Sequence, residues 1–142
     1  MEPQAVLALC HEHAAAEAAF DIDRVLATLV PVPRFEFFPL AKSLSGRANV
    51  ERFYRDQYVR FARRVTGYEL HGEWTNEHAA LQEYAIEVRD DDELMSTYHV
   101  MSMMPIDDVT GLLTGERLFC DTGFVRALLG PLVELLEPLV GI

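Results

Sequence analysis

A chain of 142 residues, half of them apolar, has enough hydrophobic material for one buried core, which excludes an intrinsically disordered protein. Its formal net charge of −11 argues against a nucleic-acid partner, because phosphate binding requires clustered Lys and Arg side chains. Two cysteines, Cys10 and Cys120, are too few for the disulfide framework of a small secreted protein.

The first third of the chain has the periodicity of helices. Over residues 3–20, apolar residues recur at helical spacing and form one face, on which His13 also lies. Asp21 is placed to cap a second short helix, because its side-chain oxygen can accept a hydrogen bond from a free backbone N–H. Pro31 and Pro33 are expected to end that helix.

The segment 34–44 is apolar but has no clear period, and it fits either a strand or a loop that lines a pocket. Ser45-Gly46 interrupts the chain, and a third helix is expected from there to Val65. The inward face of this helix consists of Val50, Phe53, Tyr54, Tyr58, Phe61 and Val65.

After Gly67 the pattern changes from helical spacing to alternation, which is typical of strands. Helices followed by strands indicate one α+β domain, with helices packed on one face of a mainly antiparallel sheet. No linker or repeat divides the chain. The expected strands are Tyr68–Thr75, Ala79–Arg89, Leu94–Met104 and Leu112–Asp121.

The segment 111–130 carries the strongest functional signal. Glu116 points to the same side of its strand as Leu118 and Cys120, toward the core, where a carboxylate is costly without a partner or a function. An apolar pocket would favour its neutral form and raise its pKa, as a general acid or base requires. An ion pair with Arg117, or an outward orientation behind a bulge, is the structural alternative.

Three other ionisable side chains are candidates for proton transfer. His99 lies in mid-strand between apolar residues, and His13 lies on a helical face; a histidine that is satisfied in the core or on the surface is the alternative for each. Asp121 could act as an acid, although capping of the following helix by Asp121 or Thr122 explains it without chemistry. The predicted catalytic residues are Glu116, His99 and Asp121.

Aromatic side chains on the inner faces are expected to hold a small apolar or aromatic ligand. Metal binding is not expected, because no close pair of inward-facing histidines is present, and His11 and His13 point to different faces of their helix. The sequence also lacks a glycine-rich phosphate loop and a nucleophile elbow, so we expect no cofactor. The predicted ligand-binding residues are His13, Tyr54, Tyr58, Trp74, Tyr84, Leu118 and Cys120.

Three short motifs follow one another along the chain: Asp21-x-Asp23, then Ser45-Gly46 before Val50 and Phe53-Tyr54, then Phe119-Cys120-Asp121 before Leu128-Leu129-Gly130. Their order and spacing, over about residues 5–130, resemble the nuclear transport factor 2-like superfamily and, within it, the SnoaL-like branch related to polyketide cyclases. The resemblance implies a curled sheet wrapped on three N-terminal helices into a cone with one apolar pocket. It also implies a homodimer formed through the outer face of the sheet. It does not settle function, because the fold hosts isomerases, dehydratases, epoxide hydrolases, cyclases and pure binders.

The catalytic residues of two families with this fold do not transfer to this chain. Ketosteroid isomerases place a base directly before the proline of the loop that leads into the third helix, where this chain has Phe38, with Glu36 two residues earlier. Limonene-type epoxide hydrolases carry an Arg-x-Asp pair on the second strand, where this chain has Tyr84 and Ile86. The pocket is therefore expected to carry polar side chains that differ from those of either family.

The sequence as a whole predicts a cofactor-free acid–base enzyme of isomerase, cyclase or dehydratase type, acting on an apolar carbonyl or polycyclic substrate. A non-catalytic ligand-binding or assembly module of the same fold is the alternative. The apolar tail, residues 131–142, is expected to pack on its own domain or on a second copy, and docking of another protein is its alternative. No signal peptide is evident and no apolar run approaches the ~20 residues of a membrane span, so we expect a cytoplasmic protein without a membrane partner.

Overall fold

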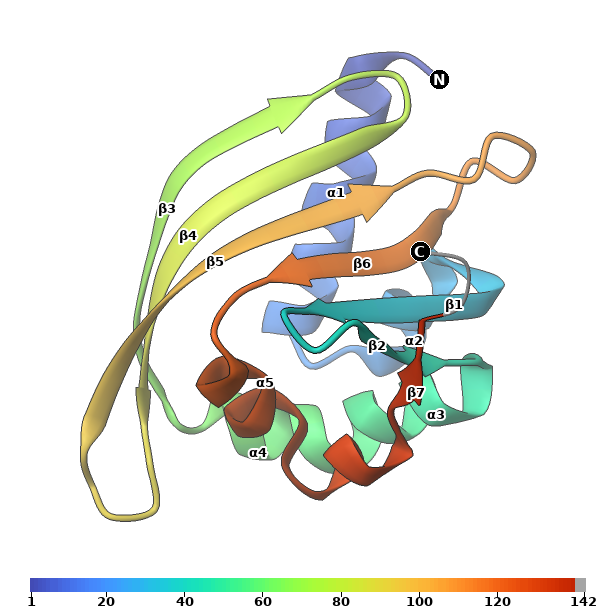
Figure 1. The fold of residues 1–142 in the computed structure, drawn as a ribbon. Helices are drawn as coiled ribbons and strands as arrows, with labels where there is room; N and C mark the ends of the chain where they lie inside the picture. The colour runs from blue at the N-terminus through green and yellow to red at the C-terminus, as the bar shows by residue number, and fades with distance from the viewer. Residues whose placement is uncertain (140–142) are drawn as a thin grey trace.

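The computed structural model describes residues 1–139, in which helices cover one face of a curved sheet (Figure 1). The predicted α+β class is confirmed. The helices are α1 (Pro3–Ala18), α2 (Ile22–Ala27), α3 (Arg47–Arg52), the π-helix η1 (Phe53–Tyr58), α4 (Val59–Ala62), α5 (Thr122–Leu129) and the 3-10 helix η2 (Gly130–Leu135). The strands are β1 (Leu29–Phe38), β2 (Lys42–Ser45), β3 (Val65–Thr75), β4 (Ala79–Arg89), β5 (Met95–Pro105), β6 (Leu113–Phe119) and β7 (Glu137–Pro138).

Within the described residues the strands form one sheet in the order β3-β4-β5-β6-β1-β2-β7. The β1–β6 pair is parallel, and the other neighbouring pairs are antiparallel. The long strands β3, β4 and β5 bend along their length, so the sheet curls around the helices (Figure 1). The sheet is therefore mainly antiparallel and has a concave inner face, as expected for a cone.

The four predicted strands correspond to β3, β4, β5 and β6, whereas the first half of β1 and the short strand β7 are not predicted by the sequence. The segment 34–44, which fitted a strand or a loop, forms the end of β1 and most of β2. Pro31 and Pro33 do not end the second helix, because α2 stops at Ala27 and both prolines lie in β1. A register break between Leu29 and Arg34 leaves them outside the ladder to β6, so their missing N–H groups cost no sheet hydrogen bond.

The third helix spans residues 47–62 and widens to π geometry in η1. The wider turn lets the consecutive residues Phe53 and Tyr54 both become buried, and the Gln57 amide donates a hydrogen bond to the carbonyl of Leu128 at 3.3 Å. π-Helical turns inside α-helices are often found at functional sites. This turn also directs Tyr58 inward, so the predicted aromatic face of the helix is present.

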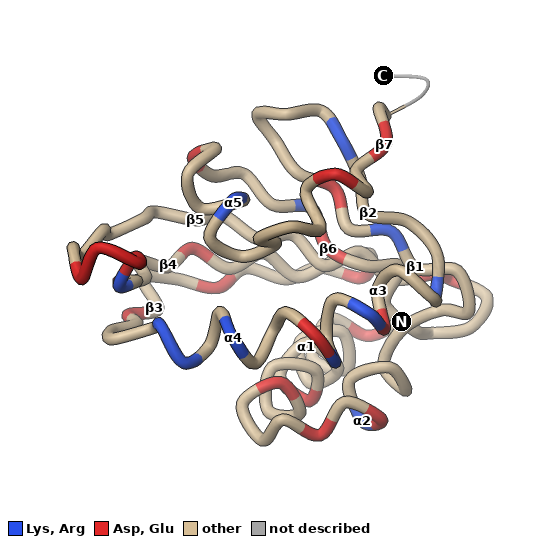
Figure 2. The backbone as a smooth tube through the Cα atoms, turned by 90° about the horizontal axis from the view of Figure 1, so that it is seen from below, with Lys and Arg blue, Asp and Glu red and all other residues tan. Residues whose placement is uncertain are grey.

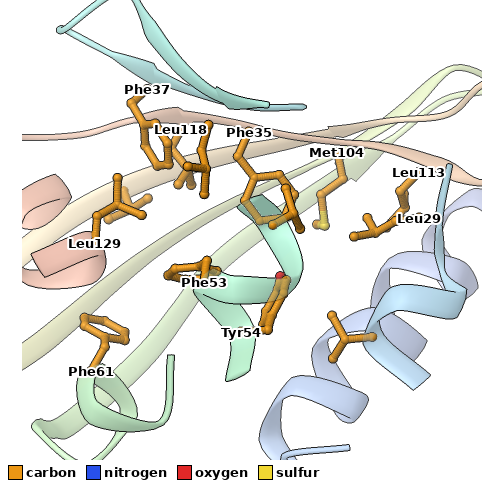
Figure 3. Packing of buried hydrophobic residues seen from close by; sticks show 14 of the residues in the cluster. Leu29, Phe35, Phe37, Phe53, Tyr54, Phe61, Met104, Leu113, Leu118 and Leu129 are labelled. Carbon is orange, nitrogen blue, oxygen red and sulfur yellow. The ribbon is translucent and has the colours of Figure 1, made fainter. Parts of the chain in front are cut away.

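The core lies between the concave face of the sheet and the helices (Figure 3). Phe35 from β1 and Leu118 from β6 point toward the helical layer, from which Phe53 and Phe61 point back. Phe35 and Phe53 pack edge to face, with ring centroids 6.4 Å apart. Such pairs bury large apolar areas and orient one another, so this layer is well placed to form a defined cavity wall.

The described part of the C-terminal tail packs on its own domain. Leu132 is buried in the core, β7 pairs with β2, and the backbone N–H of Leu139 donates to the carbonyl of Ala41 at 3.0 Å. Residues 140–142, which belong to the predicted tail, lie outside the described residues. Among residues 1–139, no helix combines the length and the apolar character that crossing a membrane requires.

The arginines along the third helix are interspersed with acidic residues (Figure 2). Arg55 contacts both Glu51 and Asp23 at 2.9 Å, and Arg52 lies 3.9 Å from Asp56. The Arg52 and Arg55 side chains are about half exposed, so both are paired and also solvated. Exposed ion pairs of this kind contribute little to stability.

Candidate functional site

A cavity of about 460 Å³ lies between the concave face of the sheet and helices α1, η1, α4 and α5. Most of its wall is aromatic or aliphatic. Among the described residues, no Lys or Arg lines it. Its polar lining consists of Glu17, Gln82, Ser102 and Glu116, together with Tyr58, Tyr68 and Tyr84.

Glu116 points from β6 into this cavity, as predicted. The Ser102 hydroxyl of the neighbouring strand β5 donates a hydrogen bond to its Oε1 at 3.1 Å. Burial raises the pKa of Glu116 to about 7, and the charge of Glu17 acts in the same direction, while His13 and Ser102 oppose the rise. Glu116 is therefore a carboxyl group that can hold or release a proton at neutral pH.

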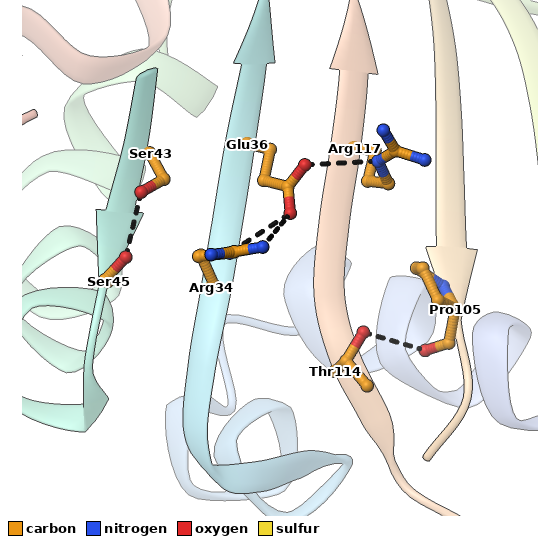
Figure 4. Close-up of polar contacts among 7 residues, drawn as sticks. All are labelled: Arg34, Glu36, Ser43, Ser45, Pro105, Thr114 and Arg117. Carbon is orange, nitrogen blue, oxygen red and sulfur yellow. Dashed lines mark hydrogen bonds and ion pairs between the residues drawn. The ribbon is translucent and has the colours of Figure 1, made fainter. Parts of the chain in front are cut away.

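Gly115, the residue before Glu116, brings β6 close to β1. Gly115 has φ +139, and a Cβ atom at this position would collide with the backbone carbonyl of Arg34 on β1. The next residue but one, Arg117, turns to the outer face and donates to Glu36 Oε2 at 3.1 Å, and Glu36 also accepts from Arg34 (Figure 4). Arg117 is thus paired with Glu36, and the alternative ion pair between Glu116 and Arg117 does not form.

Glu17, in the last turn of α1, is a second carboxylate in the same cavity, and sequence reasoning missed it. Its Oε2 lies 3.0 Å from the Tyr54 hydroxyl, and its Oε1 lies 3.7 Å from His13 Nε2. Burial raises the pKa of Glu17 to about 7, although its hydrogen bond with Tyr54 favours the charged form. Glu17 follows His13 by four residues, so the helical stripe that contains His13 was the signal that could have identified it.

His13 and Tyr54, both predicted to bind the ligand, lie behind the cavity wall and are fully buried. The Tyr54 hydroxyl lies 3.2 Å from His13 Nε2, and His13 Nδ1 lies 2.7 Å from Thr28 Oγ1. Burial lowers the pKa of His13, so the ring is neutral. These residues contact Glu17 and are placed to position it, which differs from direct contact with a ligand.

Tyr58, Tyr84 and Leu118, also predicted to bind the ligand, line the cavity. Burial and the charges of the two cavity carboxylates raise the pKa of Tyr58 and Tyr84 above the ordinary value for a phenol. Both hydroxyls therefore remain protonated donors at neutral pH, available to a ligand oxygen.

The expectation that His99 lies in the pocket is wrong. On β5 the inward positions are Val100 and Ser102, and the exposed His99 belongs to the opposite face, with its ring centroid 6.1 Å from that of His71. Strand alternation decides this, because an error of one residue in the assumed register exchanges the two faces of a strand.

The expected ligand contact by Trp74 is wrong for the same reason. Its Cα pairs with Leu81 on β4, one residue before the cavity-lining Gln82, and its side chain is 53% exposed. The indole covers Gly72, where a Cβ atom would lie only 2.7 Å from the ring. Trp74 is thus a residue of the outer sheet face.

Cys120 and Asp121 lie outside the cavity lining, contrary to prediction. Burial and the charge of Asp121 raise the pKa of Cys120 to about 11, so its thiol is unreactive at neutral pH. The exposed Asp121 occupies the N-cap position of α5, but its side chain makes no capping hydrogen bond; its backbone carbonyl accepts from the N–H of Phe124 at 3.0 Å. The position of the cap was predicted correctly and its side-chain bond was not.

Residues 1–139 contain no group of three or more His, Cys, Asp or Glu side chains arranged to hold a metal ion. The chemistry that the cavity offers is therefore that of two carboxyl groups, a serine and tyrosine hydroxyls in an apolar enclosure.

No protein-family model matches the sequence, and no curated protein matches it. Solved structures do share the fold. A protein from Jannaschia sp. CCS1, described as a SnoaL-like polyketide cyclase, has a TM-score of 0.70 at 13% identity, over 91% of this chain and 94% of that one. An NTF2-like protein from Burkholderia xenovorans LB400 has a TM-score of 0.69 at 15% identity, over 90% of this chain and 98% of that one.

The epoxide hydrolase/cyclase-like enzyme SalBIII, which is described as having a role in pyran ring formation in the polyether salinomycin, has a TM-score of 0.68 at 16% identity. The match covers 84% of this chain and 93% of SalBIII. The chain therefore adopts the α+β cone fold of the NTF2-like proteins, which the SnoaL-like protein from Jannaschia shares. At these identities the comparisons show the fold, and function has to be argued from the site.

Proposed function

We propose that this protein is a cofactor-free acid–base enzyme of isomerase, cyclase or dehydratase type. The observation that carries the proposal is the presence of two carboxyl groups, Glu17 and Glu116, in one apolar cavity, each with its pKa raised by burial to about 7. A base and an acid that both titrate near neutrality are what proton transfer within one bound molecule needs. Glu17, and not the predicted His99, is the second proton-transfer group in this proposal.

The titrations of the two carboxyl groups are linked, because the charge of Glu17 raises the pKa of Glu116. The proposed active form has one carboxyl group protonated and the other ionised. In our proposal Glu116, whose ionised form accepts the Ser102 hydrogen bond, removes a proton from a carbon atom that is acidified by a neighbouring carbonyl. Glu17 supplies a proton to the substrate oxygen or to another carbon, and tyrosine hydroxyls orient the molecule.

The lining also restricts the substrate class. Among the described residues no cation faces the cavity, and two carboxylates do, so an anionic ligand would be buried without a partner. The formal net charge of −11 opposes anions at longer range as well. We therefore expect a neutral, largely apolar substrate with a carbonyl group or fused rings, held by the aromatic side chains.

Two of the solved structures support this class of chemistry. The names of the Jannaschia protein and of SalBIII both refer to cyclases, and both share the cone fold with this chain. Ring closure of a neutral, carbonyl-bearing chain forms a new C–C or C–O bond, and two carboxyl groups can assist it when one removes a proton from the nucleophile and the other protonates the carbonyl oxygen.

The experiment uses 5-nitrobenzisoxazole, a neutral aromatic probe. A base removes its C–H proton as the N–O bond breaks, which releases a coloured cyanophenolate. Glu116→Gln keeps the shape of the side chain and removes the base, so we expect the rate above background to disappear while binding of the probe changes only a few fold. His99→Gln is the matched control and should leave the rate unchanged. The proposal would be contradicted if both variants lost the rate equally, or if neither variant lost it.

A non-catalytic binder is the second candidate, and one observation favours it. Two partly buried carboxylates inside a wall of Phe and Tyr rings also suit an organic ammonium ion, which would neutralise the acids and stack on the ring faces. Such a ligand would bind more tightly as pH rises and the carboxyl groups ionise. A neutral substrate would show no such gain, so the two candidates differ in the sign of their pH dependence.

We further propose that the protein is a homodimer, formed through the outer face of the sheet. Met101 and Phe119 pair across β5 and β6 on that face, and with Trp74 they expose apolar surface that a second copy would cover. A cytoplasmic location is also part of the proposal, and it is supported by Cys10 and Cys120, which form no disulfide.

A further inference from the structure

Behind Glu17, a chain of hydrogen-bonding groups runs from the cavity wall to the backbone. The Tyr54 hydroxyl lies 3.0 Å from Glu17 Oε2 and 3.2 Å from His13 Nε2. His13 Nδ1 lies 2.7 Å from Thr28 Oγ1, which lies 2.6 Å from the carbonyl oxygen of Val25. Hydroxyl groups and a neutral imidazole can each donate and accept, so these distances allow the donors to point in either direction along the chain.

When Glu17 is protonated, every link can be satisfied in one direction. Glu17 donates to Tyr54, Tyr54 donates to His13 Nε2, His13 donates from Nδ1 to Thr28, and Thr28 donates to the carbonyl of Val25. The neutral ring is then the Nδ1–H tautomer. No member of the chain is left without a partner.

When Glu17 has lost its proton, the same groups can be satisfied in the opposite direction. Tyr54 donates to the Glu17 carboxylate, His13 donates from Nε2 to Tyr54, and the Thr28 hydroxyl turns to donate to His13 Nδ1. The carbonyl of Val25 keeps a hydrogen bond from the backbone N–H of Thr28 at 3.1 Å. The chain holds one proton fewer, and the single ring proton of His13 has changed nitrogen.

We propose that Tyr54, His13 and Thr28 form a reversible hydrogen-bonded chain that keeps a hydrogen bond at Glu17 Oε2 whether Glu17 holds or has released its proton. In this chain the tautomer of His13 follows the protonation state of Glu17. The inference rests on the proposed function in one respect, namely that Glu17 gives up and regains a proton in the cavity. Tyr54, His13 and Thr28 are positioning residues, because they act through Glu17.

The surroundings of Glu17 and His13 allow this coupling to be observed. Besides His13 and Tyr54, the titratable groups that face Glu17 are Glu116 on β6, Tyr58 on η1, Tyr68 on β3 and Tyr84 on β4. The phenols have raised pKa values and stay neutral in the neutral range. Glu116 is the one of these groups that titrates together with Glu17. The charge of Glu116 also favours protonation of His13, but burial has the larger effect and lowers the pKa of the ring.

The experiment is an NMR titration of the ligand-free protein, labelled at Glu carboxyl carbons and His ring nitrogens. The Glu116→Gln variant serves as the background in which Glu17 titrates alone. His13→Gln identifies the His13 signals among those of the five histidines. We expect the Nδ1–H tautomer below the midpoint of Glu17 and the Nε2–H tautomer above it, with the two changes at the same pH.

Two hydroxyl variants separate coupling from packing. Tyr54→Phe keeps the ring and removes the link, so the His13 tautomer should no longer change at the Glu17 midpoint. Tyr58→Phe removes a neighbouring hydroxyl, on a ring whose centroid lies 5.6 Å from that of Tyr54, and should leave the coupling intact. Glu17→Gln should give one tautomer at every pH.

The inference would be overturned by a single His13 tautomer throughout the wild-type titration, by a doubly protonated His13 beside an ionised Glu17, or by coupling that survives in Tyr54→Phe. None of these measurements depends on turnover. A tautomer change without activity toward the probe would therefore contradict the proposed function and leave the hydrogen-bonded chain in place.

Discussion

Replacing Glu116 with Gln should stabilise the protein at alkaline pH and do so less at acid pH. Folding raises the pKa of this carboxyl group from 4.5 to about 7, so its proton is bound more tightly in the folded state. The stability that this proton contributes is fully present below pH 4.5 and is lost as pH rises through 7. At ~1.4 kcal/mol per pKa unit, the full shift corresponds to about 3 kcal/mol.

Glu116 is only partly buried and its titration is linked to that of Glu17, and both facts reduce this value. We therefore expect Glu116→Gln to gain about 2 kcal/mol relative to wild type between pH 5 and pH 8. The assay is urea unfolding of both proteins at the two pH values, with m-values checked for equality. Glu134→Gln, at an exposed position of η2, is the matched control for the removal of one carboxylate. A Glu116→Gln difference that is the same at pH 5 and pH 8 would refute the claim that burial sets the pKa of Glu116.

Three further predictions test the geometry of the site and the assembly. Gly115→Ala should destabilise the protein by about 3 kcal/mol or more, because the new methyl group collides with the carbonyl of Arg34, and a variant with wild-type urea unfolding would contradict the close β1–β6 approach. Calorimetry at pH 8 should show 2-naphthoate binding at least ~10-fold more weakly than 2-naphthylmethanol, and equal affinities would mean that the acids do not face the ligand. If 2-naphthylmethylamine binds best and gains affinity with pH, the amine-binding alternative is supported. Met101→Arg should convert a dimer to a monomer in light scattering, and an unchanged mass would refute the proposed outer-face contact.

Glu116 could be found from the sequence because its signal is local. A carboxylate in a short strand, on the row of apolar residues that includes Leu118, is placed by alternation alone. The strand β6 begins at Leu113, close to the expected start at Leu112, so the prediction of which alternate residues face the core was correct. The close contact of Gly115 with β1 is a tertiary feature, which no local pattern reveals.

His99 and Glu17 show where the sequence stops being informative. His99 lies in a strand where either set of alternate residues could face the core. Only the pairing of this strand with β4 and β6 decides which set does so. Glu17 lies one turn beyond His13, but a glutamate at the end of an alanine-rich helix reads as a solvated residue. Its burial results from Tyr54 and from the curl of the sheet over α1, which are tertiary features.

The first half of β1, before Arg34, was not predicted, and the reason is physical as well. Pro31 and Pro33 normally argue against a strand, and here they are tolerated because a register break removes them from the ladder to β6. The N-terminal cap of α5 shows the reverse case, since Asp121 occupies the expected position but its side chain forms no capping bond. Sequence propensity located part of β1 and the start of α5. Tertiary contacts determined the full extent of β1 and the hydrogen bonds at the cap of α5.

The central claim is that the cavity holds a carboxyl group that titrates near neutrality. The most direct test follows the carboxyl carbon of Glu116 by NMR as pH is raised, in the wild-type protein and in Glu17→Gln. The account predicts a Glu116 midpoint near pH 7 in wild type, which moves lower when the neighbouring negative charge of Glu17 is removed. A midpoint near 4.5 in both proteins would contradict it, because Glu116 would then behave as a carboxyl group in open solvent.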